Sequence, residues 1–221
     1  MKKNSLKMIM MTTMMLMFVG CMASTTSVQA ATKKTWKTEY MKIVKKMNKE
    51  DQAREKNAYS NNEYTYDLIY FNNDKTPELV VGLDGYWVSM YTFDAKKKKA
   101  YAVMDQWGYG ACGNVGYEYI PKKNTLRNYN SDFAGAIRYV YFGKMKNHKI
   151  VSYYKNSLKM VFFTDKNNNG YPDEDEYDES ESYYYGDKKV SSKKFDSYMK
   201  EGKYKPIIGK MSYKKIKNKL K

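Results

Sequence analysis

The chain has 221 residues and a formal net charge of +16, with 42% hydrophobic and 16% aromatic residues, which is ample material for the core of one ordinary domain. Its two cysteines and single histidine are too few for the usual four ligands of a structural zinc site. Tyrosine supplies 24 of the aromatic residues, and it suits half-buried sheet faces because its ring packs while its hydroxyl stays solvated.

Residues 1–30 are predicted to be an export signal that is not part of the fold. Three lysines precede an apolar stretch of about a dozen residues, Met8 to Val19. This stretch is shorter than the roughly twenty residues of a transmembrane helix. A small-residue cleavage site ends at Ala30, which predicts a secreted chain of residues 31–221 with no transmembrane segment after signal removal.

A lipid anchor is the alternative to secretion. Phe18-Val19-Gly20-Cys21 resembles a bacterial lipobox, in which the cysteine is lipidated and becomes the mature N-terminus. The phenylalanine departs from the usual leucine of that motif, and the polar run that precedes Ala30 is typical of an ordinary signal-peptide end. Secretion is therefore the leading hypothesis, with lipidation at Cys21 as the minor one, and both place the protein at the extracellular side.

Export also changes the charge and the cysteine content of the chain. Cleavage after Ala30 removes three lysines and no acidic residue, which lowers the net charge from +16 to +13. A cationic secreted protein stays near anionic wall polymers or lipid headgroups, although a Lys-rich surface also simply keeps a protein soluble. No nucleic acid is expected as a partner, because no recognition motif is present. Cys112 is left as the one cysteine of the secreted chain, which excludes an intramolecular disulfide.

The first predicted element is an amphipathic helix from Thr35, its N-cap, to about Asn57. Its apolar residues recur at three- and four-residue spacing, with Lys and Glu on the other face. The apolar stripe is expected to pack on a sheet, and it consists of Trp36, Tyr40, Ile43, Val44 and Met47.

The chain then changes to short β-rich runs separated by turn residues, which favours an antiparallel meander over βαβ units. The predicted strands are Tyr64–Phe71, Leu79–Val81, Trp87–Phe93, Ala100–Met104, Tyr117–Ile120, Thr125–Tyr129, Ala136–Phe142, Lys149–Tyr154 and Leu158–Thr164, with Tyr183–Tyr185 as a further short one. The glycine-rich stretch Gly108–Gly116 is interpreted as an ordered loop over a sheet end, with a ligand-binding loop as the alternative.

Two short helices are predicted near the C-terminus. The first begins at Ser191 or Ser192, runs through Lys200 and ends before Gly202, with Phe195, Tyr198 and Met199 inward. A final helix is capped by Ser212, has Ile216 and Leu220 on one face, and either docks or frays.

The predicted fold class is α+β. We expect an antiparallel β meander in one curled sheet, an N-terminal amphipathic helix and short C-terminal helices. The predicted organisation is an export signal over 1–30, a single α+β domain over 31–202 and a basic C-terminal extension over 203–221.

An acidic loop, residues 165–181, stands out against the positive charge of the chain. Its spacing fits a calcium loop, with Gly170 at the position of the sharp turn and oxygen ligands at fixed offsets. Calcium takes six to eight oxygen ligands from carboxylates, amides and carbonyls. The predicted Ca²⁺ ligands are Asp165, Asn167, Asn169, Tyr171 through its carbonyl, Asp173 through water, and Glu176 with two oxygens. The alternative is an exposed acidic loop that balances lysines.

The calcium loop departs from a full EF-hand at two points. Pro172 occupies the eighth position and has no N–H for a paired loop. The preceding run Met160–Phe163 favours a strand over an entering helix. The segment Asp165–Glu176 instead resembles the single calcium loops of thrombospondin type 3-like and other extracellular bacterial repeats, and this resemblance of a dozen residues implies calcium binding rather than a fold. Neutral Asn ligands predict weak affinity, on the order of 10⁻⁴ to 10⁻³ M.

A second turn, Phe71–Val81, is similar to the Asp-x-Asn-x-Asp-Gly-x-Pro-Glu-Leu turns of secreted bacterial proteins with FG-GAP-like β-repeats. Tyr70 replaces the first aspartate and Lys75 the glycine, so this segment is a better marker of a strand–turn–strand unit than of a metal site.

The leading hypothesis for function is a non-enzymatic, secreted or surface-associated module that calcium stabilises. Its Tyr-rich sheet would bind an anionic wall polymer, a glycan or an extracellular protein. One alternative is a secreted hydrolase that uses Cys112 with His148, or a carboxylate pair. Another alternative is a Lys-rich wall-binding adhesin. The carboxylates near predicted strand ends are Asp105, Glu118 and Asp132.

Overall fold

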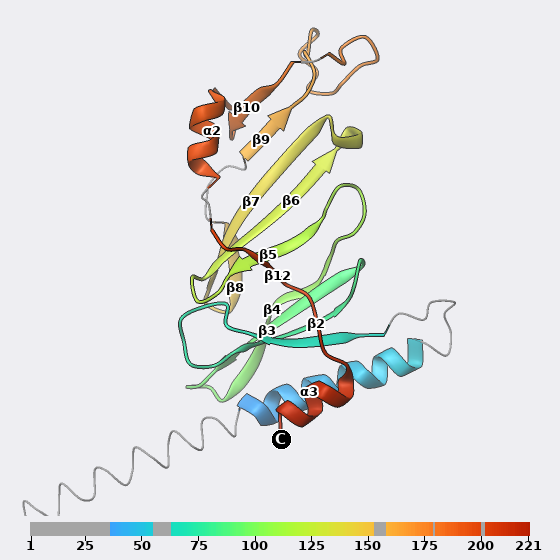
Figure 1. Ribbon diagram of the computed structural model, residues 1–221, viewed down its shortest axis with the longest axis vertical. Helices are drawn as coiled ribbons and strands as arrows, with labels where there is room; N and C mark the ends of the chain where they lie inside the picture. Colours follow the sequence, from blue (N-terminus) through green and yellow to red (C-terminus); the bar gives the residue numbers. More distant parts are fainter. Residues whose placement is uncertain (1–35, 55–62, 153–157, 179, 200–201) are drawn as a thin grey trace, which may run out of the picture.

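The computed structural model describes residues 36–54, 63–152, 158–178, 180–199 and 202–221. Two antiparallel sheets follow each other along the long axis of the molecule, with helices at the end of the smaller sheet and beside the larger one (Figure 1). This arrangement confirms the predicted α+β class with an N-terminal helix and short C-terminal helices. The meander is divided between two sheets instead of forming one curled sheet.

The smaller sheet has the order β1-β2-β3-β4 and is built from neighbouring hairpins. β2 is buried along its whole length, which places it at the centre of the core. The strands are β1 (Thr65–Ile69), β2 (Glu78–Leu83), β3 (Trp87–Asp94) and β4 (Lys99–Gly108).

The larger sheet has the order β11-β10-β9-β7-β6-β5-β12, and β8 also pairs with β7. β11 and β12 were not predicted. β11 is the short run Lys-Lys-Val and β12 is a Lys-Pro pair, and neither shows the alternation of a strand. The strands are β5 (Gly116–Ile120), β6 (Thr125–Asp132), β7 (Ile137–Lys146), β8 (Lys149–Ser152), β9 (Leu158–Val161), β10 (Ser182–Tyr185), β11 (Lys188–Val190) and β12 (Lys205–Pro206).

Helices pack on both sheets. The N-terminal helix, described over residues 36–54, lies beside α3 (Tyr213–Lys219) under the smaller sheet (Figure 1). The predicted apolar stripe faces this sheet, with Tyr40, Val44 and Met47 at most 3% exposed. The predicted N-cap Thr35 lies outside the described residues. α2 (Ser192–Tyr198) packs on β10, and Ser191 is its N-cap, because its hydroxyl accepts the N–H of Lys194.

The C-terminal segment ties the two sheets together. The N–H of Ile207 donates to the carbonyl of Tyr117 in β5, and Tyr66 in β1 exchanges backbone hydrogen bonds with Met211. Ile207 and Ile216 are fully buried, so the final helix docks on the core rather than fraying. Figure 1 shows this segment crossing from the larger sheet to the end where α3 lies.

The two sheets cover each other only in part. One core cluster joins Val80 and Met104 of the smaller sheet to Tyr119 and Leu126 of β5 and β6. The strands farther along the larger sheet, β9 to β11, contribute to other clusters. Part of one face of the larger sheet therefore extends beyond the smaller sheet.

The turn between β1 and β2 is organised by a buried carboxylate. Glu78 is 1% exposed and accepts the N–H of Phe71 at 2.9 Å. Its other oxygen accepts hydrogen bonds from Asn72 at 3.3 Å and from Thr92 at 3.2 Å. Burial raises the pKa of Glu78 from 4.5 to about 7. The turn identified in the sequence is thus closed by its own glutamate.

We predict that Glu78 makes stability depend on pH between about 4.5 and 7. Folding raises the pKa of Glu78, so its neutral carboxyl contributes stability in full below about pH 4.5. This contribution is lost as the pH rises through about 7. Glu78→Gln stays neutral, so over this window the wild type should lose about 3 kcal/mol relative to the variant. Urea unfolding of both proteins at several pH values measures this difference. A difference that does not change with pH would contradict the prediction.

Candidate functional site

The acidic loop lies at the far end of the larger sheet, beyond β9 (Figure 1). Asp165 begins it and accepts two backbone N–H groups, from Asn169 at 3.1 Å and from Gly170 at 2.9 Å. Gly170 has a φ of 80°, a left-handed conformation that glycine adopts without steric cost. The first half of the loop therefore curls around the carboxylate of Asp165.

Two asparagines connect the first half of the loop to the second. The side-chain oxygens of Asn167 and Asn169 accept the N–H groups of the residues two positions later, at 3.0 and 2.7 Å. Their amide groups both donate to one carboxylate oxygen of Asp173, at 2.6 and 3.0 Å. Four of the six predicted ligand residues thus already share one hydrogen-bonded cluster.

Glu176 closes the loop from inside the protein. It is 2% exposed although it lies among exposed acidic residues. Its carboxylate accepts the backbone N–H of Lys166 at 2.7 Å and that of Asp173 at 3.2 Å. The carbonyl of Glu176 also accepts the N–H of Thr164, which extends the pairing of the chain into the loop base. The last predicted ligand therefore holds both arms of the loop together.

The sixth predicted ligand, Tyr171, lies at the loop tip, and its side chain is 58% exposed. Its ring meets that of Phe133 edge-on, with 5.4 Å between ring centroids. Phe133 belongs to the tight turn that joins β6 and β7, so this contact ties the loop to the sheet. Over the described ranges, no group of three or more Asp, Glu, His or Cys side chains is placed to hold a metal ion.

Next to the loop, part of one face of the larger sheet is not covered by any of the described helices or strands. Side chains alternate across β7, so Val140 and Phe142 face α2 while Tyr139 and Tyr141 face the other side. On this other side, Tyr139 packs in a core cluster whose described members all belong to the sheet or to its flanking turns. Tyr141 is 43% exposed, and its ring stacks on that of Tyr139 with 6.0 Å between centroids.

We call this surface the open face, and define it as Tyr139, Tyr141, Lys159, Tyr184 and Lys189. Strand register places Tyr139, Lys159, Tyr184 and Lys189 side by side on β7, β9, β10 and β11. The ammonium group of Lys159 lies 4.8 Å from the centroid of the Tyr184 ring. Burial and the nearby carboxylate of Asp132 raise the pKa of Tyr139 and of Tyr141, so both hydroxyls stay protonated.

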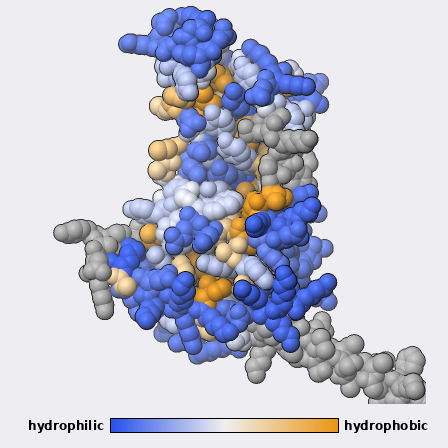
Figure 2. Space-filling model, turned by 180° about the vertical axis from the view of Figure 1, so that it is seen from behind, coloured by the Kyte–Doolittle hydropathy of each residue, from blue (hydrophilic) through white to orange (hydrophobic). Residues whose placement is uncertain are grey.

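A groove of about 430 Å³ runs between the open face and the acidic loop. Its sheet side includes Lys159, Tyr184 and Lys189, and its loop side includes Asp165 and Gly170. The predicted calcium loop therefore forms one wall of a groove whose floor carries tyrosine and lysine. Figure 2 shows one whole face of the molecule, on which hydrophilic residues predominate and apolar residues form small separate patches.

The open face was not singled out from the sequence, although a signal for it exists. Tyr139 and Tyr141 flank Val140 in strict alternation, and such a pattern marks one apolar and one half-exposed face of a strand. The lysines come from strands that pair only in the folded chain, so sequence spacing does not bring them together.

The proposed cysteine–histidine pair is not assembled. Cys112 is exposed in the loop after β4, whereas His148 lies in the turn between β7 and β8. His148 instead contacts Asp94, with 3.2 Å between Nε2 and the carboxylate, and stacks on Tyr101. This contact joins a turn of the larger sheet to a turn of the smaller one.

The three candidate carboxylates lie on three different strands. Asp105 is exposed on β4, and Asp132 is exposed at the end of β6. Glu118 on β5 accepts two hydrogen bonds from Arg127. The structure thus gives Glu118 an arginine partner that sequence spacing did not reveal.

The glycine-rich loop is ordered by its own residues. A Cβ on Gly110 would lie 2.0 Å from the carbonyl oxygen of Gly85, so only glycine fits there. Asn114 donates to the carbonyl of Gly108 and accepts from Asn128. The loop closes the end of the hairpin β3–β4, next to a groove of about 550 Å³.

No family model, curated protein or solved structure matches this chain. Within the described residues, the helices lack the length and apolar character needed to cross a membrane.

We predict that Glu176, and not its acidic neighbours, holds the loop closed. Glu176→Ala removes the acceptor of two backbone N–H groups, and leaving them unsatisfied costs about 1–3 kcal/mol. Amide hydrogen exchange over residues 165–176 should become at least about tenfold faster. Glu174→Ala is the matched control, because Glu174 is exposed two residues away. Equal acceleration in both variants, or none in Glu176→Ala, would contradict this role.

Proposed function

We propose that the chain is a secreted, non-enzymatic binding module that is stabilised by calcium and binds an extracellular anionic polymer through its open face. The observation that carries this proposal is the groove in which tyrosine and lysine side chains of the sheet meet the acidic loop. A charge of +13 after removal of the export signal favours an anionic partner.

The residues of the acidic loop fit a calcium ion by their chemistry. Asp165, Asp173 and Glu176 offer carboxylates, and Asn167 and Asn169 carry side-chain amide oxygens, which in this structure accept backbone N–H groups of the same loop. These are the hard oxygen donors that calcium prefers. Two of these residues are neutral asparagines, which supports a weak site of the extracellular kind.

Calcium and the anionic partner are expected to act together. Asp165 and Gly170 line the groove, so the loop places negative charge beside Lys159 and Lys189. A divalent cation in the loop neutralises that charge and leaves the lysines to face the ligand. Tyrosine rings add contact area while their hydroxyls hydrogen-bond at the wet surface.

We predict that terbium binds the loop and that calcium displaces it. Tyr171 lies within the loop, so bound Tb³⁺ should show tyrosine-sensitised emission, with a calcium competition constant on the order of 10⁻⁴ to 10⁻³ M. The double variant Asp165→Ala/Glu176→Gln should abolish the signal. Glu174→Gln should retain it, because this exposed residue is outside the ligand set. Emission that persists in the double variant would exclude this loop as the site.

We predict that an anionic wall polymer retains the protein in a calcium- and salt-dependent way. The probe is immobilised teichoic acid, with a column of the blocked matrix without any polymer as its control. Retention should rise with millimolar calcium and fall at 0.5 M salt, because surface charges are screened. The double variant Lys159→Gln/Tyr141→Ala should weaken retention at least about tenfold, whereas Lys97→Gln, on the turn between β3 and β4, should not. The function is refuted if the column fails to retain the wild type at low salt.

A further inference from the structure

We propose that Glu118 and Arg127 form the polar centre of a second binding site, on the opposite face of the larger sheet from the open face, that takes a neutral sugar. The two residues are directly opposite each other on the paired strands β5 and β6. No part of the proposed function depends on this pair, so the site is a further one.

The guanidinium of Arg127 is held in one orientation. Its Nε and Nη2 both donate to the Oε2 atom of Glu118, at 2.9 and 2.7 Å. The guanidinium carbon lies 3.6 Å from the centroid of the Tyr204 ring and 4.9 Å from that of Tyr129. A side chain fixed by stacking and by two hydrogen bonds loses little conformational entropy when a ligand binds.

Part of the hydrogen-bonding capacity of this ion pair is left for a ligand. Within the described part of the chain, Oε1 of Glu118 and Nη1 of Arg127 have no hydrogen-bond partner. Both side chains are partly buried, at 30% and 16% exposed. The pair thus offers an acceptor and a donor at a partly desolvated place, where hydrogen bonds contribute more than at an open surface.

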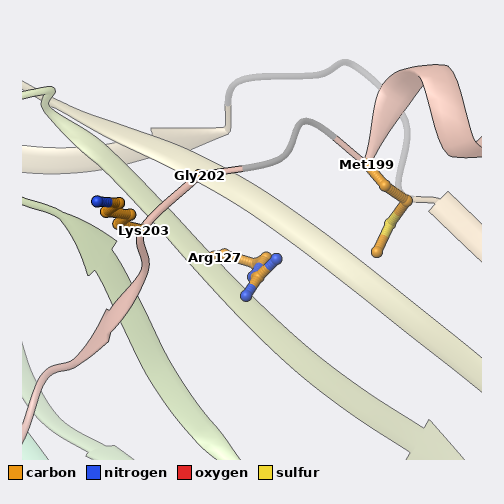
Figure 3. Close-up of a pocket in the computed structure, with 4 residues that line it drawn as sticks. All are labelled: Arg127, Met199, Gly202 and Lys203. Carbon is orange, nitrogen blue, oxygen red and sulfur yellow. The ribbon is translucent and has the colours of Figure 1, made fainter.

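Arg127 also stands where two grooves meet. One groove, of about 300 Å³, is lined by Glu118, Arg127 and tyrosines that include Tyr109 and Tyr129. The other, of about 680 Å³, is lined by Arg127, Met199, Gly202 and Lys203. Figure 3 shows Arg127 on its strand with Met199 and Lys203 on either side of it.

These features together select a neutral polyhydroxyl ligand. An anion would meet the carboxylate of Glu118 and a cation would meet Arg127, so net charge on the ligand brings no advantage at the pair. Neighbouring hydroxyls of a sugar donate and accept at once, which matches Oε1 and Nη1. The tyrosine rings can pack against the apolar C–H face of a sugar ring. The smaller groove lies at the low end of ligand-site volumes, which suits one or two sugar units.

The test is affinity electrophoresis of the full secreted chain through gels that contain a neutral polysaccharide, with dextran, mannan, xylan and galactan as separate probes. At least one should retard the wild type. Arg127→Leu and Glu118→Gln should each weaken that retardation at least about tenfold, which corresponds to the loss of a charge-assisted hydrogen bond. Arg138→Leu is the matched control, because Arg138 on β7 stacks on Phe162 and is not among the residues that line the two grooves.

A merely structural ion pair predicts a different pattern. Glu118→Gln leaves the guanidinium without a compensating charge, so at this site the variant should gain binding to sulfated dextran while it loses the neutral ligand. A structural role would lower the melting temperature without this exchange of preference. If Arg127→Leu does not fold, Glu118→Gln decides alone.

Three outcomes overturn the inference. They are no retardation by any neutral probe, equal retardation of the wild type and both variants, and a loss that is shared by Arg138→Leu. Failure of the proposed function is distinct, because it is measured on teichoic acid with variants of the open face, which leave Glu118 and Arg127 intact.

Discussion

The contact on which the rest of the structure depends is the one between the carboxylate of Glu78 and the backbone of the β1–β2 turn. This turn makes hydrogen bonds both to the N-terminal helix and to the larger sheet. Tyr40 of the N-terminal helix donates its hydroxyl to the carbonyl of Pro77, and the carbonyls of Tyr70 and Phe71 accept N–H groups from the β5–β6 turn of the larger sheet. Glu78 is buried and accepts three hydrogen bonds. Without it, one backbone donor and two side-chain donors would lack a partner in the core. The β1–β2 turn thus helps to position the two sheets relative to each other, and the side chain of Glu78 holds this turn closed.

The acidic loop repeats this device at the other end of the molecule. Glu176 is also buried, and it also accepts a backbone N–H group from the beginning of its loop, that of Lys166. The two loops differ in what lies above the glutamate. In the β1–β2 turn the carboxylate is covered by the core, and burial raises its pKa. In the acidic loop the carboxylate lies under the exposed side chains of Asn167, Asn169 and Asp173, which hydrogen-bond to one another at the surface.

Local patterns were sufficient for the elements, because alternation and helical spacing act within a few residues. The apolar stripe of the N-terminal helix and most strands of both sheets were predicted in this way. The division into two sheets was not, since β4 and β5 are separated by a glycine-rich loop whose path depends on contacts with Gly85 and Asn128. For the same reason the sequence named Glu118 as an isolated carboxylate. Its partner Arg127 lies directly opposite only once β5 and β6 are paired in register.

The two proposed binding surfaces follow from one geometric fact about the larger sheet. Its strands extend beyond both layers that cover it, and those layers are offset. The smaller sheet covers one face near β5 and β6, where Tyr119 and Leu126 are buried. α2 covers the other face near β9 and β10, where Phe195 packs on Leu158 and Val140. Among the described elements, the smaller sheet therefore leaves the open face beside the acidic loop uncovered. On the other side of the larger sheet, α2 leaves the Glu118–Arg127 pair uncovered. Because side chains alternate along each strand, the open face and the Glu118–Arg127 pair lie on opposite sides of the sheet, and a substitution on one surface can be made without altering the side chains of the other.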